Sequence, residues 1–111
     1  MKRLLCIFLL SLIAPITYAD SLPHPLDFKG TEKEKNYVAS FIKGYVEETY
    51  SKIGMGDPTT LRNIEKEEMI SFEELTKVNN RKLLDDVIKE NCKIPGMCTY
   101  SAILIMYNEK K

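Results

Sequence analysis

The sequence has a single histidine, and it contains no glycine-rich loop of the kind that binds phosphate groups. His24 stands between Pro23 and Pro25, and proline holds both itself and the residue before it in extended conformations. His24 therefore cannot share a helix face with metal ligands, and we expect it to face solvent. Serine nucleophiles consequently have no base, and a zinc site would lack ligands. The sequence predicts no cofactor and no metal site.

The sequence also lacks a large excess of basic or acidic residues. The chain of 111 residues has 16 Lys and Arg against 16 Asp and Glu. Without Lys2 and Arg3, which belong to the signal predicted below, 14 basic and 16 acidic residues leave a net charge of minus two. A nucleic-acid binder usually carries a strongly basic patch, and a membrane-surface helix a basic stripe. We therefore expect no nucleic-acid partner and no stable membrane anchor.

The apolar run at the start of the sequence is too short for a membrane span, which takes about 20 residues. It follows Lys2 and Arg3 and extends from Leu4 to Ile13. Small residues at Thr17 and Ala19 then precede polar sequence, a pattern typical of a cleavable secretory signal. The sequence predicts a signal peptide over residues 1–19 and a periplasmic or secreted protein. A short apolar helix at the N-terminus is the alternative.

Three cysteines are present, and Cys6 lies inside the predicted signal without the sequence context of a lipid-modified cysteine. Cleavage would leave 92 residues of the 111, a single domain of marginal stability. It would also leave Cys92 and Cys98 as an even pair in an oxidising compartment, which predicts one disulfide. A redox-active pair is less well supported, because five residues separate these cysteines instead of two.

The rest of the sequence predicts an extended, proline-containing arm over residues 20–30 and one helical domain over residues 31–111. Thr31 and Glu34 form the pattern of a capping box, which begins a long helix. Gly54 and Gly56 are expected to end it. The predicted apolar face of this helix has the three-and-four spacing of one helix side. It consists of Tyr37, Val38, Phe41, Ile42, Tyr45, Val46, Tyr50 and Ile53.

Further helices are predicted to begin at Asp57 with Pro58, at Ser71 with Glu74 as a second capping box, and at Asn80. Residues 100–107 are almost continuously apolar, which fits either a buried helix or a buried strand. We favour a helix because the rest of the domain is helical. The predicted fold is therefore all-α, a small bundle of four to five helices around one long helix and pinned by one disulfide. The alternative is an α+β fold with the 99–107 segment as a strand.

Acidic residues stand in adjacent pairs, so a small envelope hydrolase that uses carboxylates has to be considered. Glycosidases need two carboxyl groups that face each other across a cleft, whereas neighbours on a helix point about 100° apart. These acids lie beside lysines, and we interpret them as solvated surface with no catalytic role. The pairs are Glu47 and Glu48, Glu67 and Glu68, Glu73 and Glu74, and Asp85 and Asp86.

One segment is a candidate contact for another protein. Met55 is an adaptable apolar side chain between Gly54 and Gly56, at the expected tip of the longest helix. An ordinary interhelical loop is the alternative interpretation of this segment. The layout of a short signal and a small domain is similar to that of the small periplasmic immunity proteins and enzyme inhibitors of Gram-negative bacteria. We therefore expect a noncatalytic protein that binds another envelope protein. A self-associating structural protein, with residues 100–107 as its interface, is a further alternative.

Overall fold

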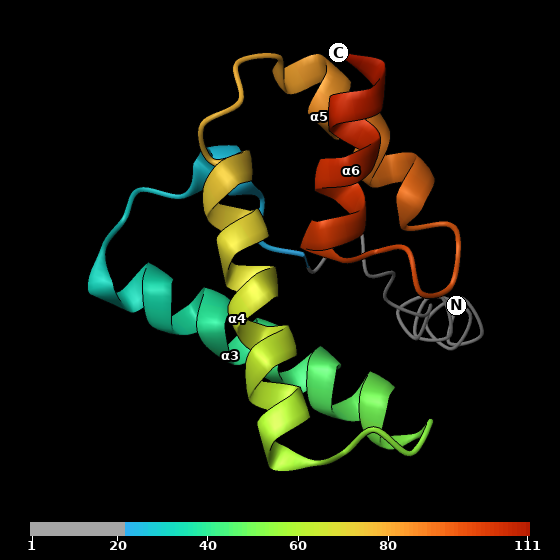
Figure 1. The fold of residues 1–111 in the computed structure, drawn as a ribbon. Coiled ribbons are helices and arrows are strands. Elements are labelled where there is room, and N and C mark those ends of the chain that lie inside the picture. Colours follow the sequence, from blue (N-terminus) through green and yellow to red (C-terminus); the bar gives the residue numbers. More distant parts are fainter. Residues whose placement is uncertain (1–21) are drawn as a thin grey trace, which may run out of the picture.

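The computed structural model describes residues 22–111, which form four α-helices preceded by one short 3-10 helix (Figure 1). The elements are η1 (Pro25–Asp27), α3 (Glu32–Ser51), α4 (Pro58–Leu75), α5 (Arg81–Asn91) and α6 (Tyr100–Lys110). The described part of the chain has no strand, so the all-α prediction is confirmed and the strand alternative for residues 99–107 is wrong. The predicted signal peptide and its cleavage site lie outside the described residues.

The predicted helix starts are largely correct. The Thr31 hydroxyl accepts a hydrogen bond from the Glu34 amide at 3.1 Å, and the Glu34 carboxylate accepts one from the Thr31 amide at 3.3 Å. Asp57 caps α4 through the Thr60 amide at 3.1 Å. Each side chain satisfies a backbone donor that the first turn of a helix leaves without an intrahelical partner. Helix α5 also begins with an N-cap, because the Asn80 side chain accepts a hydrogen bond from the Leu83 amide.

The predicted helix start at Ser71 is wrong, because α4 runs without a break through Ser71 to Leu75. Leu61, Glu68, Phe72 and Leu75 form one continuous buried face along this helix. Packing of that face outweighs the local capping signal, and Ser71 is itself buried with its hydroxyl 3.4 Å from that of Ser101.

The central helix of the fold is α4, although the sequence suggested that the helix starting at Thr31 would organise the bundle. Helix α4 packs against α3 on one side and α6 on the other, and α5 packs against α6 (Figure 1). The core lies mainly between α4, α5 and α6. Its largest fully buried side chains are Tyr100, Phe72, Ile42, Leu75, Leu84 and Ile103.

Helix α3 buries a narrower face than its sequence predicted. Val38, Ile42 and Val46 are buried, but Phe41 is only half-buried and Tyr37 is 59% exposed. The reason is that α3 has one main packing neighbour, α4, so only one narrow strip of its surface is covered.

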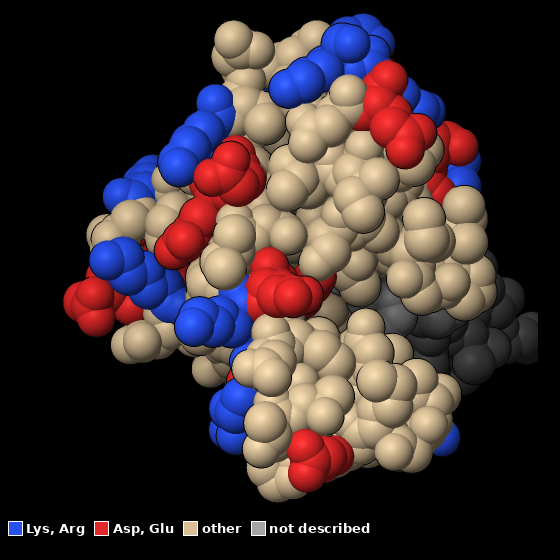
Figure 2. All heavy atoms as spheres, viewed as in Figure 1, with Lys and Arg blue, Asp and Glu red and all other residues tan. Residues whose placement is uncertain are grey.

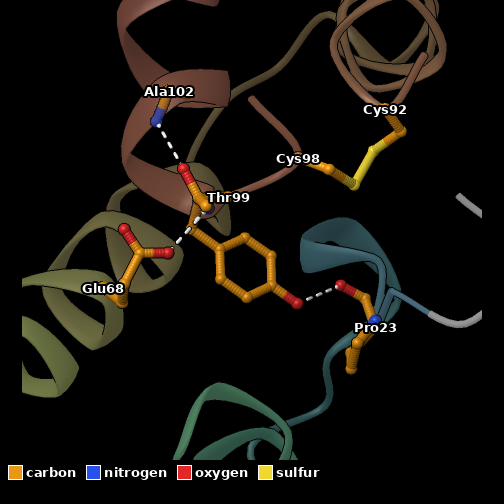
Figure 3. Close-up of a disulfide and its surroundings, with 7 residues drawn as sticks. Pro23, Glu68, Cys92, Cys98, Thr99 and Ala102 are labelled. Carbon is orange, nitrogen blue, oxygen red and sulfur yellow. Dashed lines mark hydrogen bonds between the residues drawn. A yellow bond between two sulfur atoms is a disulfide. The ribbon is translucent and has the colours of Figure 1, made fainter. Parts of the chain in front are cut away.

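Residues 22–30 pack against the helices. Pro25 is fully buried, the Phe28 ring meets the Phe72 ring edge to face at 5.0 Å, and the Tyr100 hydroxyl donates to the Pro23 carbonyl at 2.7 Å (Figure 3). The backbone is extended at His24, as the following Pro25 predicted, and also at Phe28. Residues 25–27 between them form η1, so the predicted arm is not extended throughout. This segment therefore extends the core of the domain.

The expected disulfide joins Cys92 to Cys98, across the turn between α5 and α6 (Figure 3). Gly96 supplies the left-handed conformation that this turn requires, with φ of +83°. Of the two glycines expected to end α3, Gly54 has a positive φ, +81°, and Gly56 does not. None of the helices in residues 22–111 is both long and apolar enough to cross a membrane.

Candidate binding site

A cavity of about 300 Å³ lies between α3, α4 and the disulfide turn. Most of its wall is apolar, and a few polar side chains reach it. The apolar side chains are those of Phe41, Tyr45, Val46, Tyr50, Ile64, Ile94 and Pro95, with the two cysteines. The polar side chains are those of Thr49, Glu68, Lys93 and Thr99.

The helix pairing explains why the cavity is there. Helix α3 packs on α4, whereas α5 packs on α6, so the disulfide turn and α3 face each other without close packing. Residues spaced by about four positions point to the same side of a helix, which brings Phe41, Tyr45 and Thr49 into one wall. The ring centroids of Phe41 and Tyr45 are 5.4 Å apart in an edge-to-face arrangement. The wall facing the turn is thus largely aromatic.

Glu68 is the most deeply placed polar group of the cavity wall, since only 4% of the residue is exposed. Its carboxylate lies against the first turn of α6 (Figure 3). One oxygen accepts from the Tyr100 amide at 2.8 Å and from the Tyr45 hydroxyl. The other accepts from the Ser101 amide at 3.1 Å and from the Ser101 hydroxyl. The charge lies where the helix dipole favours an anion.

These four hydrogen bonds define what Glu68 can do. A carboxylate has about four lone-pair positions, and all four are used by donors of the protein itself. Thr99 completes the cap of α6 by accepting from the Ala102 amide at 3.2 Å (Figure 3). Glu68 is therefore built to hold α6 on α4, and it offers no free lone pair to a substrate.

The interpretation of every acidic pair as solvated surface is therefore wrong for Glu68, although it is correct for the neighbouring Glu67, which is exposed. A sequence signal for this difference exists. Glu68 is four residues from both Ile64 and Phe72, so it lies on the apolar face of α4. Glu67 lies outside that face.

Burial affects two tyrosines around this carboxylate. Desolvation raises the pKa of Tyr45 far above its usual value, and the negative charge of Glu68 and its hydrogen bond raise it further. Desolvation, followed by the charge of Glu68, also raises the pKa of Tyr100. Both phenols are therefore kept as neutral hydrogen-bond donors, Tyr45 to Glu68 and Tyr100 to Pro23.

His24 is less exposed than its sequence context predicted, with 20% of its side chain accessible. Its Nδ1 atom accepts from the Leu26 amide at 3.1 Å, and its Nε2 atom is 2.6 Å from the carboxylate of Asp85. Arg81 reaches the carboxylate of Asp27 at 2.8 Å, and its hydrogen bond holds the pKa of Asp27 below the usual value. These contacts fix the N-terminal segment to α5, and both ring nitrogens of His24 are engaged.

The segment expected to contact a partner lies on the α3–α4 turn, outside the cavity wall. Met55 is 43% exposed and Ile53 is 63% exposed, with Gly54 and Gly56 beside them. Figure 2 shows a largely uncharged surface at the end of the molecule where this turn lies. A contact of Met55, Gly54 and Gly56 with a partner stays a prediction.

Within residues 22–111, no three or more His, Cys, Asp or Glu side chains are grouped so that they could hold a metal ion. Comparison with known proteins gives no relative: no protein-family model, no curated protein and no solved structure matches this chain.

Proposed function

We propose that this chain is a small, noncatalytic protein of the cell envelope that acts by binding another protein, as an immunity protein or enzyme inhibitor does. The observation that carries the proposal is the α3–α4 turn. Ile53 and Met55, on either side of Gly54, expose large apolar side chains at an end of the molecule whose surface in Figure 2 is largely uncharged. Contiguous exposed apolar surface marks protein contacts, whereas an ordinary interhelical loop is the alternative explanation for this turn, which also carries the exposed charged residues Lys52 and Asp57.

The state of the candidate catalytic groups supports a noncatalytic role. A general base needs a free lone pair within reach of the proton that it removes. The Glu68 carboxylate accepts four hydrogen bonds from the protein itself, and both nitrogens of His24 are engaged. The rival hydrolase would have to use other carboxylates, and most of these are exposed, with no burial to tune them. Glu65, with 17% of its side chain exposed, has one carboxylate oxygen paired with Arg62 at 3.2 Å.

Location in the envelope is part of the same proposal. A disulfide between Cys92 and Cys98 is typical of proteins that fold in an oxidising compartment, and rare in reducing ones. This agrees with the secretory signal that the first nineteen residues resemble.

Self-association through residues 100–107 is the weaker rival. Tyr100, Ile103 and Tyr107 are buried in the core, which leaves Ile105 as the large apolar side chain of that segment with more than half of its surface exposed. A single exposed side chain gives a helix face little apolar area to offer to a second copy.

Two matched charge substitutions test the proposal. Met55→Asp and Ile105→Asp each place a carboxylate at an exposed apolar position, one on the turn and the other on α6. Each variant would replace the natural chain in its own cells, followed by cross-linking and purification. We expect Met55→Asp to lose at least nine-tenths of the cross-linked partner and Ile105→Asp to retain it. Equal recovery with both variants, or loss only with Ile105→Asp, would contradict the proposed contact.

A further inference from the structure

The geometry points to a second binding site: the cavity between α3, α4 and the disulfide turn receives a compact, uncharged molecule with an aromatic or branched aliphatic body and one hydrogen-bonding group. This inference goes beyond the proposed protein contact. Ile53 and Met55 do not line the cavity, although the Met55 amide donates to the carbonyl of the cavity residue Tyr50 at 2.8 Å, and either assignment can fail while the other stands.

The volume limits the size of the molecule. Pockets for small molecules begin at about 300 Å³, and this cavity has about that volume. A water molecule occupies about 30 Å³ in the liquid, so the space corresponds to roughly ten waters. One ring or two fused rings fit such a space.

The wall determines the body of the molecule. Phe41 and Tyr45 present an aromatic surface from α3, Tyr50 extends it by another turn, and Ile64 faces it from α4. Aromatic side chains bind flat apolar groups by stacking or edge contacts as well as by apolar burial. An aromatic ring or a branched aliphatic group is the part that this wall would bury.

The charges near the cavity argue for a neutral molecule. The negative charge of Glu68 is already compensated by four donors, so it attracts a cation only weakly. Lys93 is the one cationic side chain of the wall. Its ammonium group lies 3.3 Å from the Glu90 carboxylate, and this negative charge weakens the attraction of Lys93 for an anion. Thr49 and Thr99 also line the cavity, and each has a hydroxyl that can donate one hydrogen bond. One polar group on the bound molecule can form a hydrogen bond with these threonines.

The first experiment uses the processed chain with its disulfide intact, labelled with ¹⁵N and titrated with three probes of the same ring system. Indole is neutral, tryptamine is cationic and indole-3-acetate is anionic. We expect saturable shifts from indole at the amides of Thr49, Ile94 and Thr99, and an affinity at least fivefold above that for either charged probe. Tighter binding of a charged probe would overturn the assignment of a neutral ligand.

Two substitutions on α4 locate the site. Ile64→Phe adds volume inside the cavity, whereas Met69→Phe adds volume at a half-buried position that does not line it. Indole affinity should fall at least tenfold in the first variant and less than twofold in the second. Intermolecular nuclear Overhauser effects between indole and Ile64 or Tyr50 in the unsubstituted chain give the same answer if Ile64→Phe does not fold. Binding that is unsaturable, unaffected by Ile64→Phe or without these contacts would overturn the proposed site.

Discussion

At the scale of single residues, Glu68 is a buried side chain whose hydrogen bonds link three of the helices. It joins three elements, because it stands on α4, accepts from Tyr45 of α3 and caps the start of α6. A buried charge is costly unless donors surround it, and here each oxygen has two. Removal of the charge should therefore leave donors of α6 without an acceptor.

The prediction for this residue is that Glu68→Gln lowers the free energy of unfolding by about 2–4 kcal/mol. The glutamine amide would place its own donors against the Ser101 amide and hydroxyl. Urea unfolding followed by circular dichroism measures the change. Glu67→Gln, at the exposed neighbour, is the control and should change stability by less than about 0.5 kcal/mol. Equal effects of the two substitutions would show that Glu68 does not hold α6.

Tyr45 gives a prediction for alkaline pH. Its pKa is raised in the folded protein, so above pH 10 the unfolded chain loses this proton first. The folded state then binds more protons than the unfolded state, and stability falls as the pH rises. In Tyr45→Phe this contribution is absent, and the decline above pH 10 should be shallower by up to about 1.4 kcal/mol per pH unit. Identical slopes in urea unfolding at pH 9.5–11 would contradict the burial of this phenol.

At the scale of elements, local signals in the sequence predicted most of the helices correctly. The caps at Thr31, Asp57 and Asn80 depend on backbone donors within three residues, and such contacts can be read without knowledge of the fold. The same signal was wrong at Ser71, because there tertiary packing of Phe72 and Leu75 keeps the helix intact. Residues 100–107 could not be assigned from periodicity, since both helices and strands bury such runs.

The disulfide turn between α5 and α6 carries a prediction of its own. Replacement of both Cys92 and Cys98 by serine should lower the free energy of unfolding by about 2 kcal/mol, the loop-closure entropy of a seven-residue ring. The helical circular dichroism spectrum should keep its shape, because α5 and α6 remain capped by Asn80 and Thr99. Loss of the helical signal in this variant would mean that the turn directs folding of both helices.

At the scale of the whole molecule, the sequence predicted a single small helical domain, but it did not predict the cavity. Its walls come from α3, α4 and the disulfide turn, and no local pattern reports the angle between helices that are distant in sequence. Phe41 shows the consequence. Its spacing predicted a core position, and the structure places it half-buried on the cavity wall.

A comparison of two phenylalanines tests this architecture. Phe72 is fully buried between Phe28 and Tyr100, so Phe72→Ala should cost about 3–5 kcal/mol of unfolding free energy. Phe41→Ala removes a ring that already borders open space, and about 1–2 kcal/mol is expected from its smaller buried area. Chemical denaturation of both variants gives the two values. A larger loss for Phe41→Ala than for Phe72→Ala would contradict the placement of the core.

The central claim is that this chain works as a bound partner of another envelope protein, and native mass spectrometry tests it most directly. The chain would be isolated from its own cell envelope at natural expression. The account predicts a mass that corresponds to cleavage after Ala19 and to a disulfide, in a one-to-one complex that Met55→Asp abolishes. A chain found only as a monomer or homodimer, in preparations where known envelope complexes survive, would contradict it.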